Sequence, residues 1–260
     1  MITEYPDDYT HGIQVPYIAP VGLTWPQKLN ETMANAIKDA NPMLWATQYQ
    51  QRPTVETGEI FHADWWQFYD IYDPINSQIV LDDGTRIGIR SKAIYADTAM
   101  KTGERNDYSV FQLWADLVNG HIALIEQERG KWEAPELLER FDAFVGAHQF
   151  KTQVINMGVR SVKVEDKASG TGLIQSSKWN VEGIPRDIDK VSRAKSCAPQ
   201  IQLGKVYLPR GKPWIVEYVR EFVAFNSEMT HKHDDQIDPT LDAVNDLIIH
   251  NTSIGYGSVI

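Results

Sequence analysis

Several features that define whole classes of protein are missing from this sequence. Cys197 is the single cysteine, so an intramolecular disulfide is impossible and a cysteine-based zinc site is not expected. No apolar run approaches the roughly 18 residues of a membrane-spanning helix, so no membrane association is predicted. The N-terminus is acidic and lacks the basic and apolar regions of a secretory signal. These absences fit residence in a cytosol.

Three motifs of nucleotide binding and acyl transfer are missing as well. The chain contains no Gly-x-x-x-x-Gly-Lys-Ser/Thr loop to cradle phosphates. No Gly-x-Gly-x-x-Gly follows a predicted strand, and no Gly-x-Ser-x-Gly turn offers a serine nucleophile. The sequence alone therefore does not support an ATPase, a dinucleotide enzyme or an esterase.

Charge is unevenly distributed along the 260 residues, whose net charge is -10. Residues 160–220 hold 12 basic and 6 acidic side chains, whereas the rest of the chain holds 13 basic and 29 acidic. A basic segment inside an acidic chain is compatible with a local phosphate-binding face and equally with ordinary charge segregation. The candidate DNA-binding residues in this segment are Arg186, Lys190, Arg193 and Lys195, and a solvated loop is the competing interpretation.

The chain divides into two regions of different character. Residues 1–52 contain four spaced prolines in their first half, which favours extended, turn-linked structure, and then two helical stretches at 25–40 and 41–51. This region has too little apolar content to fold alone. We therefore expect an N-terminal extension over 1–52 and one main domain over 53–260.

The main domain shows a strand and helix order typical of one fold class. Strands are predicted at 88–97, 108–116, 121–128, 159–164 and 181–184, and helices at 134–149, 171–178, 212–225 and 235–250. Three antiparallel strands, then alternating helices and strands, form the order of the ribonuclease H-like fold. We expect an α/β fold with a mixed five-stranded sheet flanked by helices.

Three acidic clusters stand at comparable places in this order. Asp97 ends the first strand, Glu165 and Asp166 end the fourth, and Asp234, Asp235 and Asp238 open the last helix. In a ribonuclease H-like sheet the first and fourth strands are parallel neighbours, so their carboxyl ends converge. A single Asp after a strand is usually a turn residue, and acids at a helix start complement its dipole. Three clusters that a fold brings together instead predict a divalent-metal site.

Oxygen ligands suit Mg²⁺ or Mn²⁺, and phosphodiester cleavage by two metals needs carboxylates that hold the ions about 3.5–4 Å apart. Adjacent Glu165 and Asp166 point to opposite faces if their strand continues, so one of them faces the metals. The spacing does not decide which one, nor which of the three acids on the last helix takes part.

An ordered set of motifs resembles the C-terminal nuclease domain of the large terminase subunit of tailed bacteriophages, over about residues 45–250. The matching stretches are Tyr49-Gln-Gln-Arg-Pro53, Phe61-His-Ala-Asp-Trp65, Ala96-Asp-Thr-Ala99, Val164-Glu-Asp-Lys-Ala-Ser-Gly170, Gly204-Lys-Val-Tyr-Leu-Pro209 and His233-Asp-Asp-Gln-Ile-Asp238.

The resemblance implies a metal-dependent endonuclease that cuts concatemeric viral double-stranded DNA during genome packaging. It implies that Asp97, Glu165 or Asp166, and one of Asp234, Asp235 and Asp238 hold the metals, with Asp107 as a further ligand. Its implied partners are the terminase small subunit and the portal protein, and its implied location is the host cell cytoplasm.

The chain departs from the family pattern in two respects. The ATPase motor with its Walker motifs is missing, so we expect a fragment or a separately produced nuclease half that cannot translocate DNA by itself. Pro239 follows Asp238 where the family usually continues with Ala, and proline tolerates only a first helical turn. The last helix therefore starts near this position or later.

Two other functions remain compatible with the residues. A ribonuclease H-like resolvase or transposase would act on branched or paired ends, which a four-way-junction substrate distinguishes from linear DNA. A docking module for the portal or the small subunit would have no catalysis, and Mg²⁺- or Mn²⁺-dependent plasmid nicking separates it from both nucleases.

Overall fold

The computed structural model describes residues 18–19, 22–23, 59–99, 108–149, 158–167, 169–228 and 233–250. The chain forms two compact units, one of residues 1–56 with 211–217 and one of residues 57–210 with 218–260. In the first unit, β1 (Ile18–Ala19) and β2 (Gly22–Leu23) form an antiparallel pair. The helices predicted at 25–40 and 41–51 lie outside the described residues, and the domain boundary at residue 52 stays a prediction.

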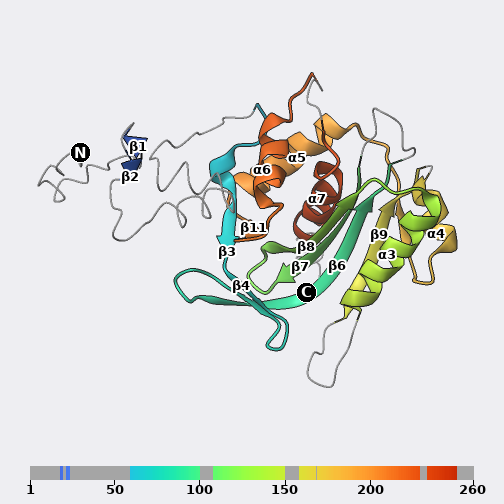
Figure 1. Ribbon diagram of the computed structural model, residues 1–260, viewed down its shortest axis with the longest axis horizontal. Coiled ribbons are helices and arrows are strands. Elements are labelled where there is room, and N and C mark those ends of the chain that lie inside the picture. The colour runs from blue at the N-terminus through green and yellow to red at the C-terminus, as the bar shows by residue number, and fades with distance from the viewer. Residues whose placement is uncertain are drawn as a thin grey trace, which may run out of the picture. The chain divides into compact units, whose positions relative to one another are not determined.

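The second unit is built on a mixed sheet in the strand order β10-β9-β6-β7-β8-β11-β3 (Figure 1). Its strands are β3 (Gln67–Tyr69), β6 (Arg86–Asp97), β7 (Ser109–Leu117), β8 (Ile122–Gly130), β9 (Val159–Glu165), β10 (Glu182–Ile184) and β11 (Val206–Pro209). β6, β7 and β8 are antiparallel, whereas β9 runs parallel to β6 and β10 parallel to β9. This arrangement confirms the expected ribonuclease H-like class.

The sheet is larger than the five strands expected from the sequence. β11 pairs with β8 on one side and with β3 on the other. β4 (Ile71–Asp73) and β5 (Gln78–Val80) form a hairpin, and β5 pairs with the start of β6. Each additional strand is only three or four residues long. Segments this short carry too little alternation to be recognised from periodicity.

β7 lies at the centre of the sheet, and all nine of its residues are buried. Alternate side chains of a strand point to opposite faces, so both faces must be covered. Phe111 and Leu113 join the apolar core under α3 (Ala134–His148), where the Phe141 ring meets the Phe111 ring edge-on with 5.3 Å between their centroids. The apolar face of an amphipathic helix therefore covers one face of the strand.

The opposite face of β7 is covered by α7 (Ile237–Val244), which continues as a π-helix over Asn245–His250. Gln112 is fully buried on this face and donates a hydrogen bond to the backbone oxygen of Gln236 at 3.1 Å. Thr240 donates to the side-chain oxygen of Gln112 at 3.0 Å. Since a buried polar group without a partner is costly, these bonds select one position of α7 on the sheet.

The remaining helices differ from the expectations in their ends. α4 (Ser169–Ser176) begins two residues earlier than predicted, and α6 (Ile215–Ala224) is shorter than the expected 212–225. α7 begins at Ile237 with Pro239 in its first turn, where a missing N–H costs nothing. α5 (Lys190–Gln202) was not predicted, because Pro199 lies inside it and its polar residues outnumber its apolar ones.

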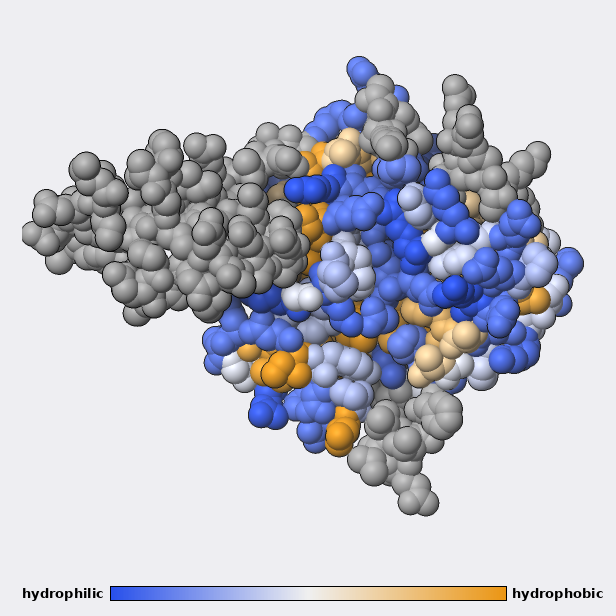
Figure 2. All heavy atoms as spheres, in the orientation of Figure 1, coloured by the Kyte–Doolittle hydropathy of each residue, from blue (hydrophilic) through white to orange (hydrophobic). Residues whose placement is uncertain are grey.

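Apolar side chains are mainly internal. On the face shown in Figure 2, hydrophilic residues cover most of the described surface and hydrophobic residues form small separate patches. None of the described helices combines the length and the apolar character needed to cross a bilayer.

Two glycines of α4 give a matched test of how closely this helix packs on the end of β9. A Cβ at Gly170 would lie 1.9 Å from the backbone oxygen of Glu165, whereas a Cβ at Gly172 would meet nothing within 4 Å. We expect Gly170→Ala to lower the free energy of unfolding by about 1–3 kcal/mol, as overpacking does. Gly172→Ala should raise it by about 0.5–1 kcal/mol, because alanine favours the helix. Urea denaturation measures both, and equal effects of the two changes would contradict the close approach.

Candidate metal centre

Two of the predicted acids meet at one edge of the sheet. Asp97 is the last residue of β6, and Glu165 is the last residue of β9. The strands are parallel neighbours with Ala96 paired to Val164, so the next residues of both strands lie side by side. The Glu165 side chain lies within hydrogen-bonding range of Asp97.

The surroundings of Asp97 disfavour its negative charge. Burial, the carboxylate of Asp238 and the neighbouring Glu165 raise the pKa of Asp97 well above its ordinary value, although Lys190 opposes this shift. Asp97 and Asp238 therefore lie close enough to repel each other across the end of the sheet. Such repulsion is the electrostatic condition under which a cation binds.

Asp166, the neighbour of Glu165, points elsewhere. Its side chain is exposed, and its Oδ1 accepts a hydrogen bond from the Thr171 hydroxyl at 2.9 Å. The alternation of side chains at the end of β9 produces this division. The structure thus brings Glu165 to Asp97 and directs Asp166 toward α4.

Asp238, in the first turn of α7, is buried and held by two cations from α5. The ammonium group of Lys190 lies 2.6 Å from its Oδ2, and the guanidinium group of Arg193 contacts its Oδ1. Burial would raise the pKa of Asp238, but Lys190 and Arg193, with Arg186 beyond them, lower it. Asp238 is therefore ionised and already paired with cations of the chain.

The other two acids of this cluster lie in different surroundings. Asp234 shares Lys190 with Asp238, at 2.8 Å from the ammonium nitrogen. Asp235 accepts hydrogen bonds from the backbone N–H of Tyr108 at 3.0 Å and from Arg129 at 3.1 Å. Asp235 thus belongs to a charged cluster over β7 and β8.

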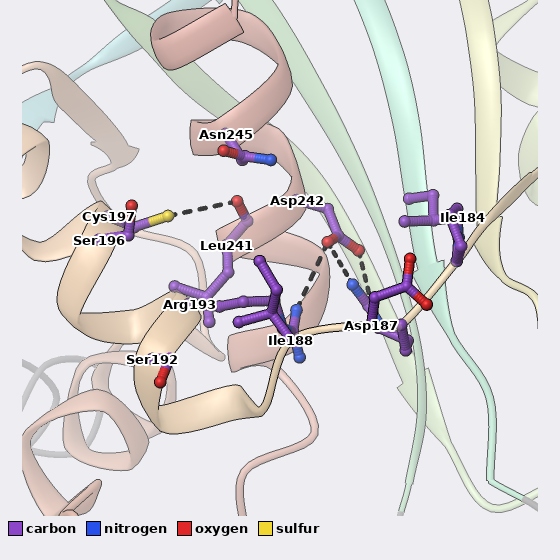
Figure 3. A pocket seen from close by; sticks show the side chains of 12 residues that line it. Ile184, Asp187, Ile188, Ser192, Arg193, Ser196, Cys197, Leu241, Asp242 and Asn245 are labelled. Atoms are coloured by element: carbon purple, nitrogen blue, oxygen red, sulfur yellow. Dashed lines mark hydrogen bonds and ion pairs between the residues drawn. The ribbon is translucent and has the colours of Figure 1, made fainter.

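A buried ion pair links the end of β9 to α7. Arg186 follows β10 and donates to both carboxylate oxygens of Asp242, at 2.5 and 2.8 Å, while its Nε lies 3.3 Å from Glu165. Burial raises the pKa of Asp242 despite this pairing. A cavity of about 210 Å³ adjoins the pair, and Ile184, Ile188 and Leu241 contribute its apolar wall (Figure 3).

The four basic residues proposed to contact DNA differ in their partners and in their exposure. Arg186, Lys190 and Arg193 all pair with carboxylates of the acidic clusters. Lys195 is exposed on α5. Their role toward DNA stays a prediction.

Two functional features were missed by sequence reasoning. α5 carries Lys190 and Arg193 in its first turn, and its start was marked by Asp189, whose side chain caps the backbone N–H of Ser192. Asp242 proves to be the partner of Arg186, a pairing that no sequence pattern indicated. Asp107 lies outside the described residues.

The donor set fits a hard divalent cation. Asp97 and Glu165 place two carboxyl groups in contact, and carboxylate oxygens are the ligands that Mg²⁺ and Mn²⁺ prefer. Within the part of the chain that the structure describes, no three His, Cys, Asp or Glu side chains are gathered as a complete metal cage. The third acid, Asp238, pairs with Lys190 and Arg193 instead. The three acids are thus suitable ligand types, but their carboxylates do not surround one point.

Replacement of Asp97 by Asn tests this electrostatic description. Because the folded-state pKa of Asp97 is raised, the metal-free wild-type protein loses stability as the pH rises from the ordinary carboxyl pKa through the folded one. We expect Asp97→Asn to raise Tm in EDTA at pH 7 by about 2–4 °C, and the difference to shrink on acidification. Asp166→Asn is the matched control and should leave Tm unchanged. A lower Tm for Asp97→Asn would contradict the repulsion.

Comparison with known proteins identifies the family and supports the fold. The sequence pattern of the family described as Terminase RNaseH-like domain matches residues 94–247. A search of curated proteins finds no match. The structure is similar to the large terminase of a thermophilic bacteriophage, with a TM-score of 0.51 and 13% identity over 85% of this chain and 53% of that one.

It is also similar to the large terminase nuclease of thermophilic phage G20c, with a TM-score of 0.46 and 16% identity over 71% of this chain and 95% of that one. The first of these two similarities supports the fold assignment, and this chain spans about half of that large terminase. Since the family pattern covers more than half of the chain, including Asp97, Glu165 and Asp238, the protein belongs to the family of terminase RNaseH-like domains.

Proposed function

We propose that this protein is a metal-dependent endonuclease that cuts concatemeric viral double-stranded DNA during genome packaging, as the nuclease half of a large terminase. The observation that carries the proposal is the convergence of Asp97, Glu165 and Asp238. These acids come from three distant segments, the ends of β6 and β9 and the start of α7. Family membership supports the same conclusion.

The three acids are the proposed ligands of Mg²⁺ or Mn²⁺. Two such ions, when bound, activate a water and stabilise the leaving oxygen of a phosphodiester. Asp97 and Glu165 would hold one side of the centre, and Asp238 would close it from α7. Asp234 shares Lys190 with Asp238 and is the alternative acid from this cluster. Asp166 and Asp235 are less favoured because their carboxylates accept hydrogen bonds from Thr171 and from Tyr108 and Arg129. Asp107 stays a proposed further ligand.

The remaining proposals concern translocation, partners, location and the contact with DNA. This chain spans about half of the large terminase to which it is similar, so we assign DNA translocation and ATP hydrolysis to a part that this chain does not contain. The portal protein and the terminase small subunit are the proposed partners, and the host cytoplasm is the proposed location. Of the four candidate DNA-binding residues, Lys195 is the exposed one, and it is the first choice for a phosphate contact.

Plasmid nicking in Mg²⁺ or Mn²⁺ tests the proposed ligands. A metal supplies several kcal/mol of transition-state stabilisation, so loss of a ligand should lower the cleavage rate by about 100-fold or more. We expect this loss for Asp97→Ala and for Glu165→Gln. Asp166→Asn, one residue from Glu165, should cut at the wild-type rate because its carboxylate faces Thr171.

Each outcome separates the competing functions. If Asp97→Ala cuts as fast as wild type, the metal centre is not at this edge of the sheet. Wild-type protein that never cuts with either metal would favour a docking module. A strong preference for a four-way junction over linear duplex would favour a resolvase.

A further inference from the structure

The charge network around Asp238 gives Lys190 and Arg193 a role that the sequence did not reveal. Both side chains come from the first turn of α5 and converge on Asp238 of α7. They are nearly buried, with side-chain exposures of 16% and 17%, and Asp238 is 6% exposed. Ion pairs this deep are weakly screened, so they compete effectively for the carboxylate.

We propose that Lys190 and Arg193 are internal counter-cations of the metal centre, which hold Asp238 in the absence of metal and which a divalent ion must displace from that carboxylate. The proposal rests on the proposed function, because it takes Asp238 as a metal ligand. It goes beyond that function by assigning competition with the metal to two residues first selected as phosphate contacts.

The charge balance supports this assignment. The network joins five carboxyl groups, those of Asp97, Glu165, Asp234, Asp238 and Asp242, to three buried cations, Arg186, Lys190 and Arg193. When all five are ionised, two negative charges remain, which one divalent ion would neutralise. Lys167 also lies 3.3 Å from Glu165, but its side chain is 62% exposed and water screens its charge.

The geometry shows where the competition takes place. Asp97 and Glu165 present carboxyl groups to each other, so a cation can enter between them without breaking an ion pair of α5. Asp238 offers both oxygens to α5 instead, Oδ2 to Lys190 and Oδ1 to Arg193. A divalent ion coordinated by all three acids therefore competes with Lys190 and Arg193 for the oxygens of Asp238.

Lys190 and Lys195 provide a matched pair for the test. Both are lysines of α5, but Lys190 is within 2.8 Å of Asp234 and Asp238, whereas Lys195 is exposed. Calorimetric titration of the full chain with Mn²⁺ alone measures affinity without any cleavage step. The proteins compared are wild type, Lys190→Met, Lys190→Arg and Lys195→Met, each checked for folding by circular dichroism.

We expect Lys190→Met to bind Mn²⁺ about tenfold more tightly than wild type, a gain of about 1.4 kcal/mol, because the competitor is gone. Lys190→Arg keeps the charge and Lys195→Met leaves the network intact, so both should bind as wild type does. If the methionine variant does not fold, Lys190→Gln gives the same comparison with a polar side chain.

Two results would overturn the inference. Unchanged or weaker Mn²⁺ binding by Lys190→Met and Lys190→Gln, with clear binding by wild type, would show that Lys190 does not compete, while leaving the proposed function standing. Absence of Mn²⁺ binding in every protein would overturn the proposed function and this inference together.

Discussion

Repulsion among carboxylates gathered at the end of a sheet is the constraint on which the rest of this structure depends. Asp97 at the end of β6, Glu165 at the end of β9 and Asp238 at the start of α7 are brought together by the fold, and burial of Asp97 strengthens the effect. Like charges in a region of low dielectric are stable only with compensation. Arg186, Lys190 and Arg193 provide that compensation from the segment between β10 and the first turn of α5.

Strand pairing, a buried amide and one buried arginine position these charges. The parallel pairing of β6 with β9 sets Asp97 beside Glu165, and the hydrogen bonds of buried Gln112 to α7 set the place of Asp238. Arg186 then spans the gap between Glu165 and Asp242. A sheet register, a buried amide and a buried guanidinium thus hold these acids near one another despite their mutual repulsion.

Periodicity and element order predicted the fold class and the five strands β6 to β10, because long buried strands such as β7 and an amphipathic α3 have strong patterns. Strand order also predicted that the ends of β6 and β9 meet, and the parallel pairing of these strands confirms this, whereas the metal role of the acids there stays a prediction. The sequence could not choose between Glu165 and Asp166, because side-chain direction at a strand end depends on where the strand geometry stops. It also missed α5, whose helical pattern is weakened by Pro199 and whose charges find their partners only in three dimensions.

The central claim is that Asp97, Glu165 and Asp238 form one divalent-metal centre. A crystal of the protein soaked in Mn²⁺, with anomalous diffraction recorded, tests it most directly. The account predicts an anomalous peak bounded by the carboxylates of these three residues. A peak elsewhere on the protein, or none at a Mn²⁺ concentration that supports DNA cleavage, would contradict it.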